Sequence, residues 1–221
     1  MKNRTLLIVI GAIVVVLGLA GIAVALSGGD DSTDSATTVP AGSAPAGEVE
    51  QNRPVTVTGD VVPALDAAVA VDPAIGTEFP TLAGQSFDGT PITVGGATDG
   101  PTMVVYLAHW CPHCNREVPE LIKLNDSGGI PEELKVVGVS TAADSTAPNY
   151  PPSTWLADKG WPWKAMADDE ASTGFVVSGG SGFPYLVILD ADGKIIARDS
   201  GEKSAEDLKV WIDDALASTT T

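Results

Sequence analysis

The hydrophobic pattern of the chain predicts a set of short strands. Residues 103–107 and 136–139 are continuous apolar runs of strand length, which is typical of central strands covered on both faces. Residues 185–190 and 194–198 predict two more strands, joined by a turn that carries the Asp192-Gly193 hairpin signal. Residues 80–82 and 85–94 suggest another hairpin around Asp88 and Gly89, and residues 55–58 predict a short strand.

Helical periodicity appears between these strands. A helix is expected from the cysteines at 111–114 through Asn125, with Pro119 introducing a kink, because apolar residues recur there at helical intervals. A last helix should follow Ser204 and present one apolar face made of Leu208, Trp211, Ile212 and Leu216. Shorter helices are expected over residues 65–71, 152–159 and 168–177. Because strands and helices alternate, the predicted fold class is α/β with a mixed central sheet.

The start of the chain has the pattern of a membrane anchor. Residues 6–26 carry no charge, and 21 residues at about 1.5 Å each span roughly 31 Å, close to the thickness of the hydrocarbon core of a bilayer. Lys2 and Arg4 precede this segment, so residues 1–5 are expected in the cytoplasm and the rest outside. The alternative is a cleaved signal peptide with a site at residues 23–25, which also exports the domain.

Composition separates the remainder into a tether, a domain and a tail. Residues 27–53 are rich in Gly, Ser, Thr, Ala, Pro and acidic groups, so we predict a flexible tether there. Residues 54–217 form the predicted extracytoplasmic domain, and residues 218–221 a disordered tail.

Charge excludes some classes of function. The formal net charge is −17, and after residue 26 the chain has 10 basic and 29 acidic residues, a balance of −19. This charge repels phosphate backbones and anionic headgroups, so it argues against a nucleic-acid-binding protein or a basic peripheral membrane protein.

The two cysteines of the chain lie three positions apart, after a predicted strand and at the start of a predicted helix. At that place the helix N-terminus favours a thiolate on Cys111, and Cys114 lies one turn later, so the pair can alternate between dithiol and disulfide. Pro112 suits the first helical position, and a protonated His113 would stabilise the thiolate and make the disulfide more oxidising.

Two other interpretations of the cysteines stay open at this point. An inert structural disulfide would close too short a loop to stabilise the fold much. A copper or zinc site, as in a metal chaperone, would use the four ligands His109, Cys111, His113 and Cys114.

The run Trp110-Cys111-Pro112-His113-Cys114 through Glu117 and Pro119, with Phe183-Pro184 before a later strand, resembles the thioredoxin fold. More narrowly it resembles the TlpA/ResA-like membrane-anchored thiol–disulfide oxidoreductases, over residues 76–216. The resemblance implies that Cys111 attacks or carries the exchanged disulfide and that Cys114 resolves the mixed disulfide. No organic cofactor is needed, since the redox-active disulfide does the chemistry.

The resemblance also assigns roles to neighbouring residues. Pro184 is expected to be cis and to face the cysteines, and the backbone of Phe183 to pair with an extended partner segment beside Trp110. Glu117 is expected to be a partly buried carboxyl that moves a proton for Cys114, in place of an ordinary surface glutamate. The implied partners are protein thiols or disulfides of the cell envelope and a membrane redox partner.

The motif departs from its family at one position. His113 is typical of DsbA-type oxidants, whereas the surrounding frame resembles reductants of the TlpA/ResA group. The direction of electron flow therefore stays open between an oxidant of secreted proteins and a reductant in a pathway such as cytochrome maturation. A peroxidase of the peroxiredoxin kind is disfavoured, because Ala108, His109 and Trp110 precede Cys111 where that group has a threonine.

Overall fold

The structure, a computed structural model, describes residues 49–218. The predicted stub at 1–5, the membrane anchor at 6–26, the tether up to residue 48 and the end of the tail at 219–221 lie outside the described residues. Within residues 49–218, no helix combines the length and apolar character needed to cross a bilayer.

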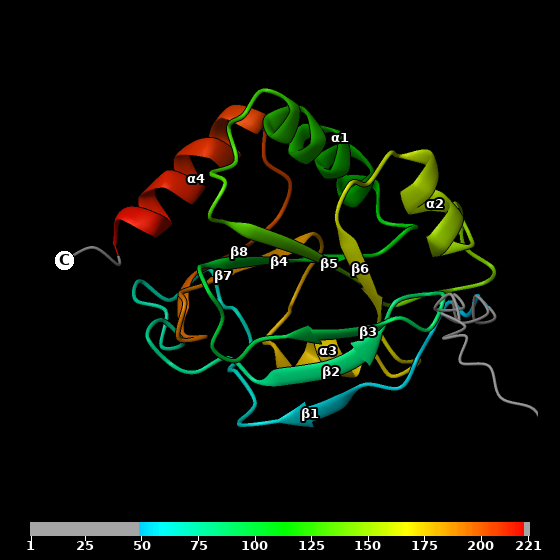
Figure 1. Ribbon diagram of the computed structural model, residues 1–221, viewed down its shortest axis with the longest axis horizontal. Helices are drawn as coiled ribbons and strands as arrows, with labels where there is room; N and C mark the ends of the chain where they lie inside the picture. Colours follow the sequence, from blue (N-terminus) through cyan, green and yellow to red (C-terminus); the bar gives the residue numbers. More distant parts are fainter. Residues whose placement is uncertain (1–48, 219–221) are drawn as a thin grey trace, which may run out of the picture. The chain divides into compact units, whose positions relative to one another are not determined.

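One mixed sheet contains the eight strands found in the described residues (Figure 1). At its centre β4 (Thr102–Leu107), β5 (Lys135–Ser140) and β6 (Lys164–Ala167) run parallel, while β7 (Tyr185–Leu189) and β8 (Ile195–Ser200) follow antiparallel beyond β4. A hairpin of β2 (Thr81–Gln85) and β3 (Pro91–Val94), flanked by β1 (Thr56–Thr58), reaches the β6 edge only through Gln85 and Ala167. The predicted α/β class with a mixed sheet is confirmed.

The side chains of β4 enter two different cores because alternate residues of a strand point to opposite faces. Met103, Val105 and Leu107 belong to a core closed by α1 (Pro112–Asp126), α2 (Pro152–Asp158) and α4 (Ala205–Ala217). Val104 and Tyr106 belong to the core on the other face, where the β2–β3 hairpin and α3 (Thr173–Val177) lie (Figure 1). Burial on both sides explains why the whole strand is apolar.

The final helix begins as predicted. The Ser204 hydroxyl accepts a hydrogen bond from the Asp207 N–H at 3.2 Å, which satisfies one free donor of the first turn of α4. Leu208 and Ile212 are fully buried against the sheet, so the predicted apolar face is the one that packs.

The helix predicted over residues 65–71 is wrong. This segment forms turns, with the Asp66 carboxylate accepting the Ala68 N–H and the Asp66 carbonyl accepting the Val69 N–H. Val69 and Val71 are exposed, so no apolar face is buried that could stabilise a helix of only two turns.

Two further elements differ from prediction. Strand β6 was not predicted, because its Lys-Ala-Met-Ala sequence has low β-propensity, and its pairing with β5 supplies what the sequence lacks. Helix α3 starts at Thr173 instead of residue 168, because the carboxylates of Asp168 and Asp169 accept N–H groups of its first turn from outside the helix.

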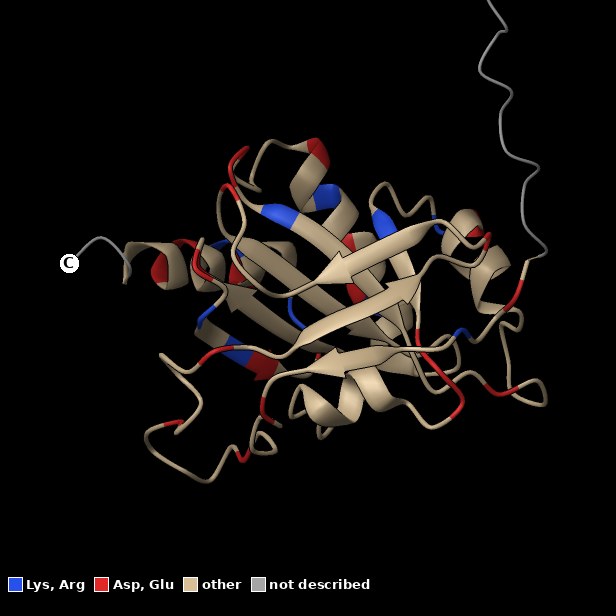
Figure 2. Cartoon of the chain, turned by 60° about the horizontal axis from the view of Figure 1, so that its bottom comes forward, with Lys and Arg blue, Asp and Glu red and all other residues tan. Residues whose placement is uncertain are grey.

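The domain holds residues that we assigned to the tether. Glu50 donates its N–H to the Phe87 carbonyl, and Arg53 donates from its backbone to Asp168 and from its guanidinium to Phe87. The chain therefore contacts the domain from residue 50 onward, before the predicted domain start at residue 54. Figure 2 shows acidic residues in many of the surface loops and basic residues at few places between them.

Candidate functional site

The turn from β4 into α1 positions both cysteines. Cys111 is the N-cap of α1 and Pro112 occupies its first turn, as expected for a residue without an N–H. The Cys111 Sγ accepts the Cys114 N–H at 3.5 Å, and both cysteines are free. Cys111 keeps 5% exposure whereas Cys114 has none, so only Cys111 is accessible to a partner.

The Phe183–Pro184 loop lies opposite Cys111. The Phe183–Pro184 peptide bond is cis, as predicted, and the Cys111 Sγ lies 3.8 Å from the Phe183 carbonyl. The Trp110 ring packs edge-on against the Phe183 ring at 5.8 Å, while its Nε1–H donates to the Ala142 carbonyl at 2.8 Å. The cis-proline loop, Trp110 and the accessible sulfur therefore form one surface. Tyr150–Pro151 is a second cis bond, which we did not predict.

Cys114 and Glu117 form a buried pair of acids beneath that surface. Burial raises the pKa of the Cys114 thiol strongly, and the charges of Cys111 and Glu117 raise it further. Glu117 has no exposure, and burial raises the pKa of its carboxyl to about 7. The alternative of a surface glutamate is thus wrong. A carboxyl that titrates near neutral pH can accept or return a proton at low cost.

Only one of the two oxygen atoms of the buried Glu117 carboxylate has a hydrogen-bond partner among the described residues. Its Oε2 accepts the Lys203 N–H at 2.6 Å, whereas its Oε1 is buried without a hydrogen-bond partner among the described residues. One oxygen atom therefore has no donor to stabilise its negative charge, which agrees with the raised pKa of this carboxyl.

His113 lies on the exposed side of the same helical turn. Its Nδ1 is 3.0 Å from the Glu202 Oε2, and the Arg116 Nη2 lies 3.0 Å from the same nitrogen. A hollow of about 500 Å³ opens here, lined by His113, the cis-proline loop and residues 200–204. The hollow places charged side chains beside Phe183, whose carbonyl faces Cys111.

His109 does not join the cysteines. It has no exposure, its Nδ1 is 2.8 Å from the Pro148 carbonyl and its Nε2 accepts the Asp144 N–H at 3.1 Å. Both nitrogen atoms are used by the loop that follows β5. Nowhere in residues 49–218 do three metal-binding side chains converge, so the four-ligand site considered for copper or zinc is not assembled.

Asn115 connects three parts of the site by side-chain hydrogen bonds, a role that the sequence did not indicate. Its Nδ2 donates to the carbonyls of His109 and Cys111 at 3.0 Å, and its Oδ1 accepts the Trp155 Nε1–H at 2.9 Å. These bonds fix the backbone on both sides of Trp110 and attach it to α2.

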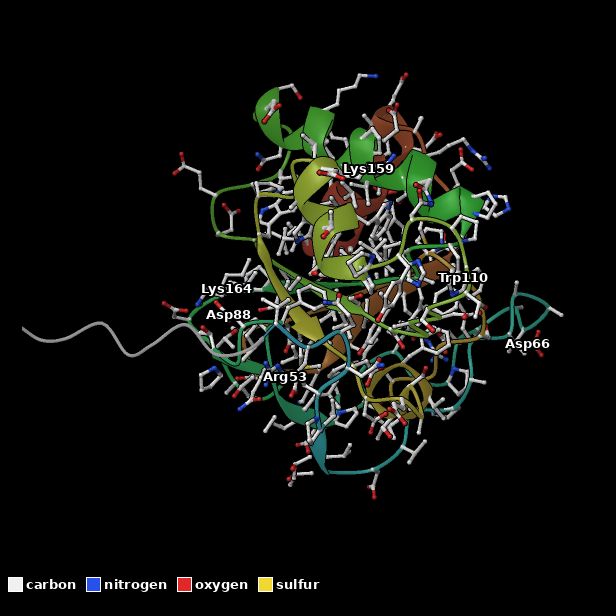
Figure 3. The ribbon with its side chains drawn as sticks, turned by 90° about the vertical axis from the view of Figure 1, so that its right-hand side faces the viewer. Arg53, Asp66, Asp88, Trp110, Lys159 and Lys164 are labelled. Atoms are coloured by element: carbon white, nitrogen blue, oxygen red, sulfur yellow. The ribbon has the colours of Figure 1, made fainter. Side chains whose placement is uncertain are left out.

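Lys159 compensates a defect that Pro119 creates. A proline at 119 has no N–H for the carbonyl of Asn115 four residues earlier. The Nζ of Lys159, the residue that caps the C-terminus of α2, donates to that carbonyl at 3.1 Å. Lys159 is labelled in Figure 3. The helix thus continues through Pro119 with its free acceptor satisfied by a lysine 44 positions away.

Comparison with known proteins agrees with this geometry. Residues 74–212 match the family described as Redoxin. The chain is 28% identical over 130 residues to "Thiol:disulfide interchange protein HelX" of Rhodobacter capsulatus, covering 58% of this chain and 69% of that protein. It is 31% identical over 108 residues to a "Thiol:disulfide interchange protein DsbE homolog" of Paracoccus denitrificans, covering 49% of this chain and 55% of that protein.

Solved structures support the fold. A thiol:disulfide interchange protein of the thioredoxin family from Chlorobium tepidum superposes with a TM-score of 0.51 at 22% identity, covering 64% of this chain and 97% of that chain. A DsbF homologue from Corynebacterium diphtheriae gives a TM-score of 0.51 at 19% identity, covering 62% of this chain and 85% of that chain. The thioredoxin-like fold predicted from the resemblance is confirmed.

Proposed function

The chain belongs to the redoxin family, and from that premise we propose that this thiol–disulfide oxidoreductase exchanges disulfides with cysteines of other proteins outside the cytoplasm. One observation carries the proposal. The accessible Cys111 sulfur caps α1, faces the Phe183 carbonyl beside the cis bond to Pro184, and lies one turn before the buried Cys114.

The exchange has two steps that balance. In the reducing direction the Cys111 thiolate attacks a partner disulfide, so one S–S bond forms, one breaks and a partner thiolate leaves. The Cys114 thiolate then attacks the Cys111 sulfur and releases the second partner thiolate. Two electrons pass to the partner, and the Cys111–Cys114 dithiol becomes a disulfide. Oxidation of a partner dithiol is the same sequence reversed.

Glu117 serves the second step. Burial disfavours the Cys114 thiolate, so this thiol needs a base close by before it can attack. The Glu117 carboxyl lies one turn further along α1, is buried and has a pKa of about 7. In the proposed mechanism it takes the Cys114 proton as the mixed disulfide is resolved and returns it in the reverse reaction.

The partner segment binds at the cis-proline loop. The Phe183 backbone precedes the start of β7 and faces Cys111, so an extended segment can pair with it as an added strand. Trp110 and Phe183 supply an apolar contact beside the reacting sulfur.

The direction of exchange depends on the charges around Cys111. His113 favours an oxidant, since a protonated imidazole beside the thiolate stabilises the reduced form. The opposing Glu202 carboxylate favours the second candidate, a reductant of the cytochrome-maturation type. A reduction potential of about −120 mV would assign the oxidant, and one of about −270 mV the reductant.

We also propose that residues 6–26 anchor the chain as a single membrane span with the domain outside the cell membrane. Support comes from the apolar length and from Lys2 and Arg4 before it. A membrane anchor restricts the domain to envelope partners, including a membrane redox partner that renews its dithiol or disulfide.

Trapping tests the function directly. In Cys114→Ser the first exchange proceeds but the resolving thiol is gone. A covalent disulfide between Cys111 and the partner should therefore accumulate, and a thiol reductant should cleave it. Cys111→Ser is the matched control, since it keeps one thiol but loses the attacking one. Equal adducts from both variants, or none from Cys114→Ser in cells, would refute exchange with protein substrates.

A further inference from the structure

We propose that Glu202 is a positioning residue that makes the Cys111–Cys114 couple more reducing, by offsetting the positive charge that His113 and Arg116 place beside Cys111. The inference rests on the proposed function, because it concerns the redox pair of that site.

Glu202 binds both basic groups at once. Its carboxylate accepts from the Arg116 Nε at 2.8 Å on each oxygen, and its Oε2 lies 2.7 Å from the Arg116 Nη2 and 3.0 Å from the His113 Nδ1. These bonds, first to Arg116 and then to His113, lower the pKa of Glu202 to about 2. The carboxylate therefore stays ionised wherever thiol exchange proceeds.

The position of Glu202 is set by the fold. It lies in the loop between β8 and α4, 89 positions from His113 in the sequence. The backbone that follows Glu202 is attached to α1 at two points, since the Lys203 N–H donates to Glu117 and the Ala205 N–H donates to Glu120. The loop thus holds one anionic side chain against the outer face of the first turns of α1.

The sign of the effect follows from the charges. Arg116 and a protonated His113 together contribute two positive charges close to Cys111, and the charge of Cys111 in turn favours the protonated form of Arg116. Glu202 removes one of them in either protonation state of His113. A less positive environment stabilises the thiolate less, so the reduced form loses stability and the potential falls.

A second effect of Glu202 has the opposite sign. A carboxylate beside an imidazole also favours the imidazolium, which would make the couple more oxidising. The two effects separate in the His113→Ala background, where no imidazole is present and only the direct offset of the Arg116 charge acts. The remaining charged neighbour in the loop, Lys203, is directed to Asp199 at 2.8 Å.

The test is the equilibrium of the full-length protein with glutathione at about pH 8.5. In Glu202→Gln we expect the equilibrium constant to move about tenfold toward the dithiol, which is about 30 mV more oxidising. Glu202→Asp should stay within twofold of the natural protein because it keeps the charge. Glu206→Gln, an equal loss of charge at an exposed position of α4, should also stay within twofold.

Repeating the measurement with His113→Ala isolates the partners. Glu202→Gln should still shift the potential in that background through Arg116. Denaturant unfolding of the reduced and the oxidised forms distinguishes tuning of the potential from a merely structural role. A structural role would change the stability of both forms equally and leave the reduction potential unchanged. An unchanged or more reducing potential in Glu202→Gln would overturn the inference.

The inference and the proposed function fail in different ways. A partner trapped by Cys114→Ser with no shift in Glu202→Gln overturns the role of Glu202 alone. A shift in Glu202→Gln without any trapped partner overturns exchange with proteins and leaves the tuning of the couple intact.

Discussion

Glu117→Gln offers a direct measurement of how strongly burial of one carboxyl opposes folding. The substitution keeps the shape of the side chain and the acceptor for the Lys203 N–H, but it removes the ability to ionise. The folded pKa of Glu117 is about 7 against 4.5 for an ordinary glutamate. At 1.36 kcal/mol per pKa unit this difference corresponds to about 3 kcal/mol.

The sign fixes the pH range of the effect. Below pH 4.5 the carboxyl is protonated in both states and does not disfavour folding. Between pH 4.5 and about pH 7 the unfolded chain loses the proton of Glu117 while the folded protein keeps it, so the free energy of unfolding falls as the pH rises. Above that range the loss is complete and constant.

The assay is denaturant unfolding of the reduced protein over this pH range. We expect the free energy of unfolding of the natural protein to fall by about 3 kcal/mol relative to Glu117→Gln between the acidic and alkaline ends. The control is Glu120→Gln on the same helix. The hydrogen bond from the Ala205 N–H lowers the pKa of Glu120. The Glu120 carboxylate therefore stabilises the fold at pH values above the ordinary pKa of a glutamate, and this stabilisation is lost on acidification. Parallel profiles for the natural protein and Glu117→Gln would refute the burial argument.

Three further substitutions test contacts that hold the site and the fold. Lys159→Met removes the donor to the Asn115 carbonyl and should destabilise the protein by about 1–2 kcal/mol in denaturant unfolding; unaltered stability would show that the acceptor finds another partner. Arg198→Met leaves the Asp72 carboxylate without its cation and should cost about 3 kcal/mol by the same assay, and a loss below about 1 kcal/mol would show that the pair is compensated by water. Ser204→Ala removes the cap of α4 and should lower stability by about 1 kcal/mol, measured by thermal unfolding; an unshifted transition would mean that the cap contributes nothing.

Part of the site could be predicted because its signals are local. The Cys111 and Cys114 pair follows a continuous apolar strand and opens an amphipathic helix, and spacing along that helix sets both the cap and the burial of Glu117. The cis bond before Pro184 followed from the resemblance and from its place before a strand. The first two features depend on residues a few positions apart, whereas the cis bond was found through the resemblance of the whole motif.

Other predictions failed where local pattern and packing disagree. In residues 65–71 only Leu65 packs against the core while Val69 and Val71 stay exposed, so no continuous apolar face is buried and the segment forms turns. Strand β6 has a weak strand sequence and exists because β5 pairs with it along four residues. His109 offered a ligand in the sequence, yet the loop after β5 uses both of its nitrogen atoms.

The sequence by itself determined the spacing of the two cysteines at the start of a helix, the alternation of strands and helices and the acidic character of the domain, since composition and short-range spacing contain that information. Only the tertiary structure decided what surrounds the pair. Glu202 and Lys159 reach α1 from 89 and 44 positions away, and no pattern along the chain indicates such contacts. Charge and hydrogen bonding act through space, so the balance of charge around Cys111 is set by the folded loops.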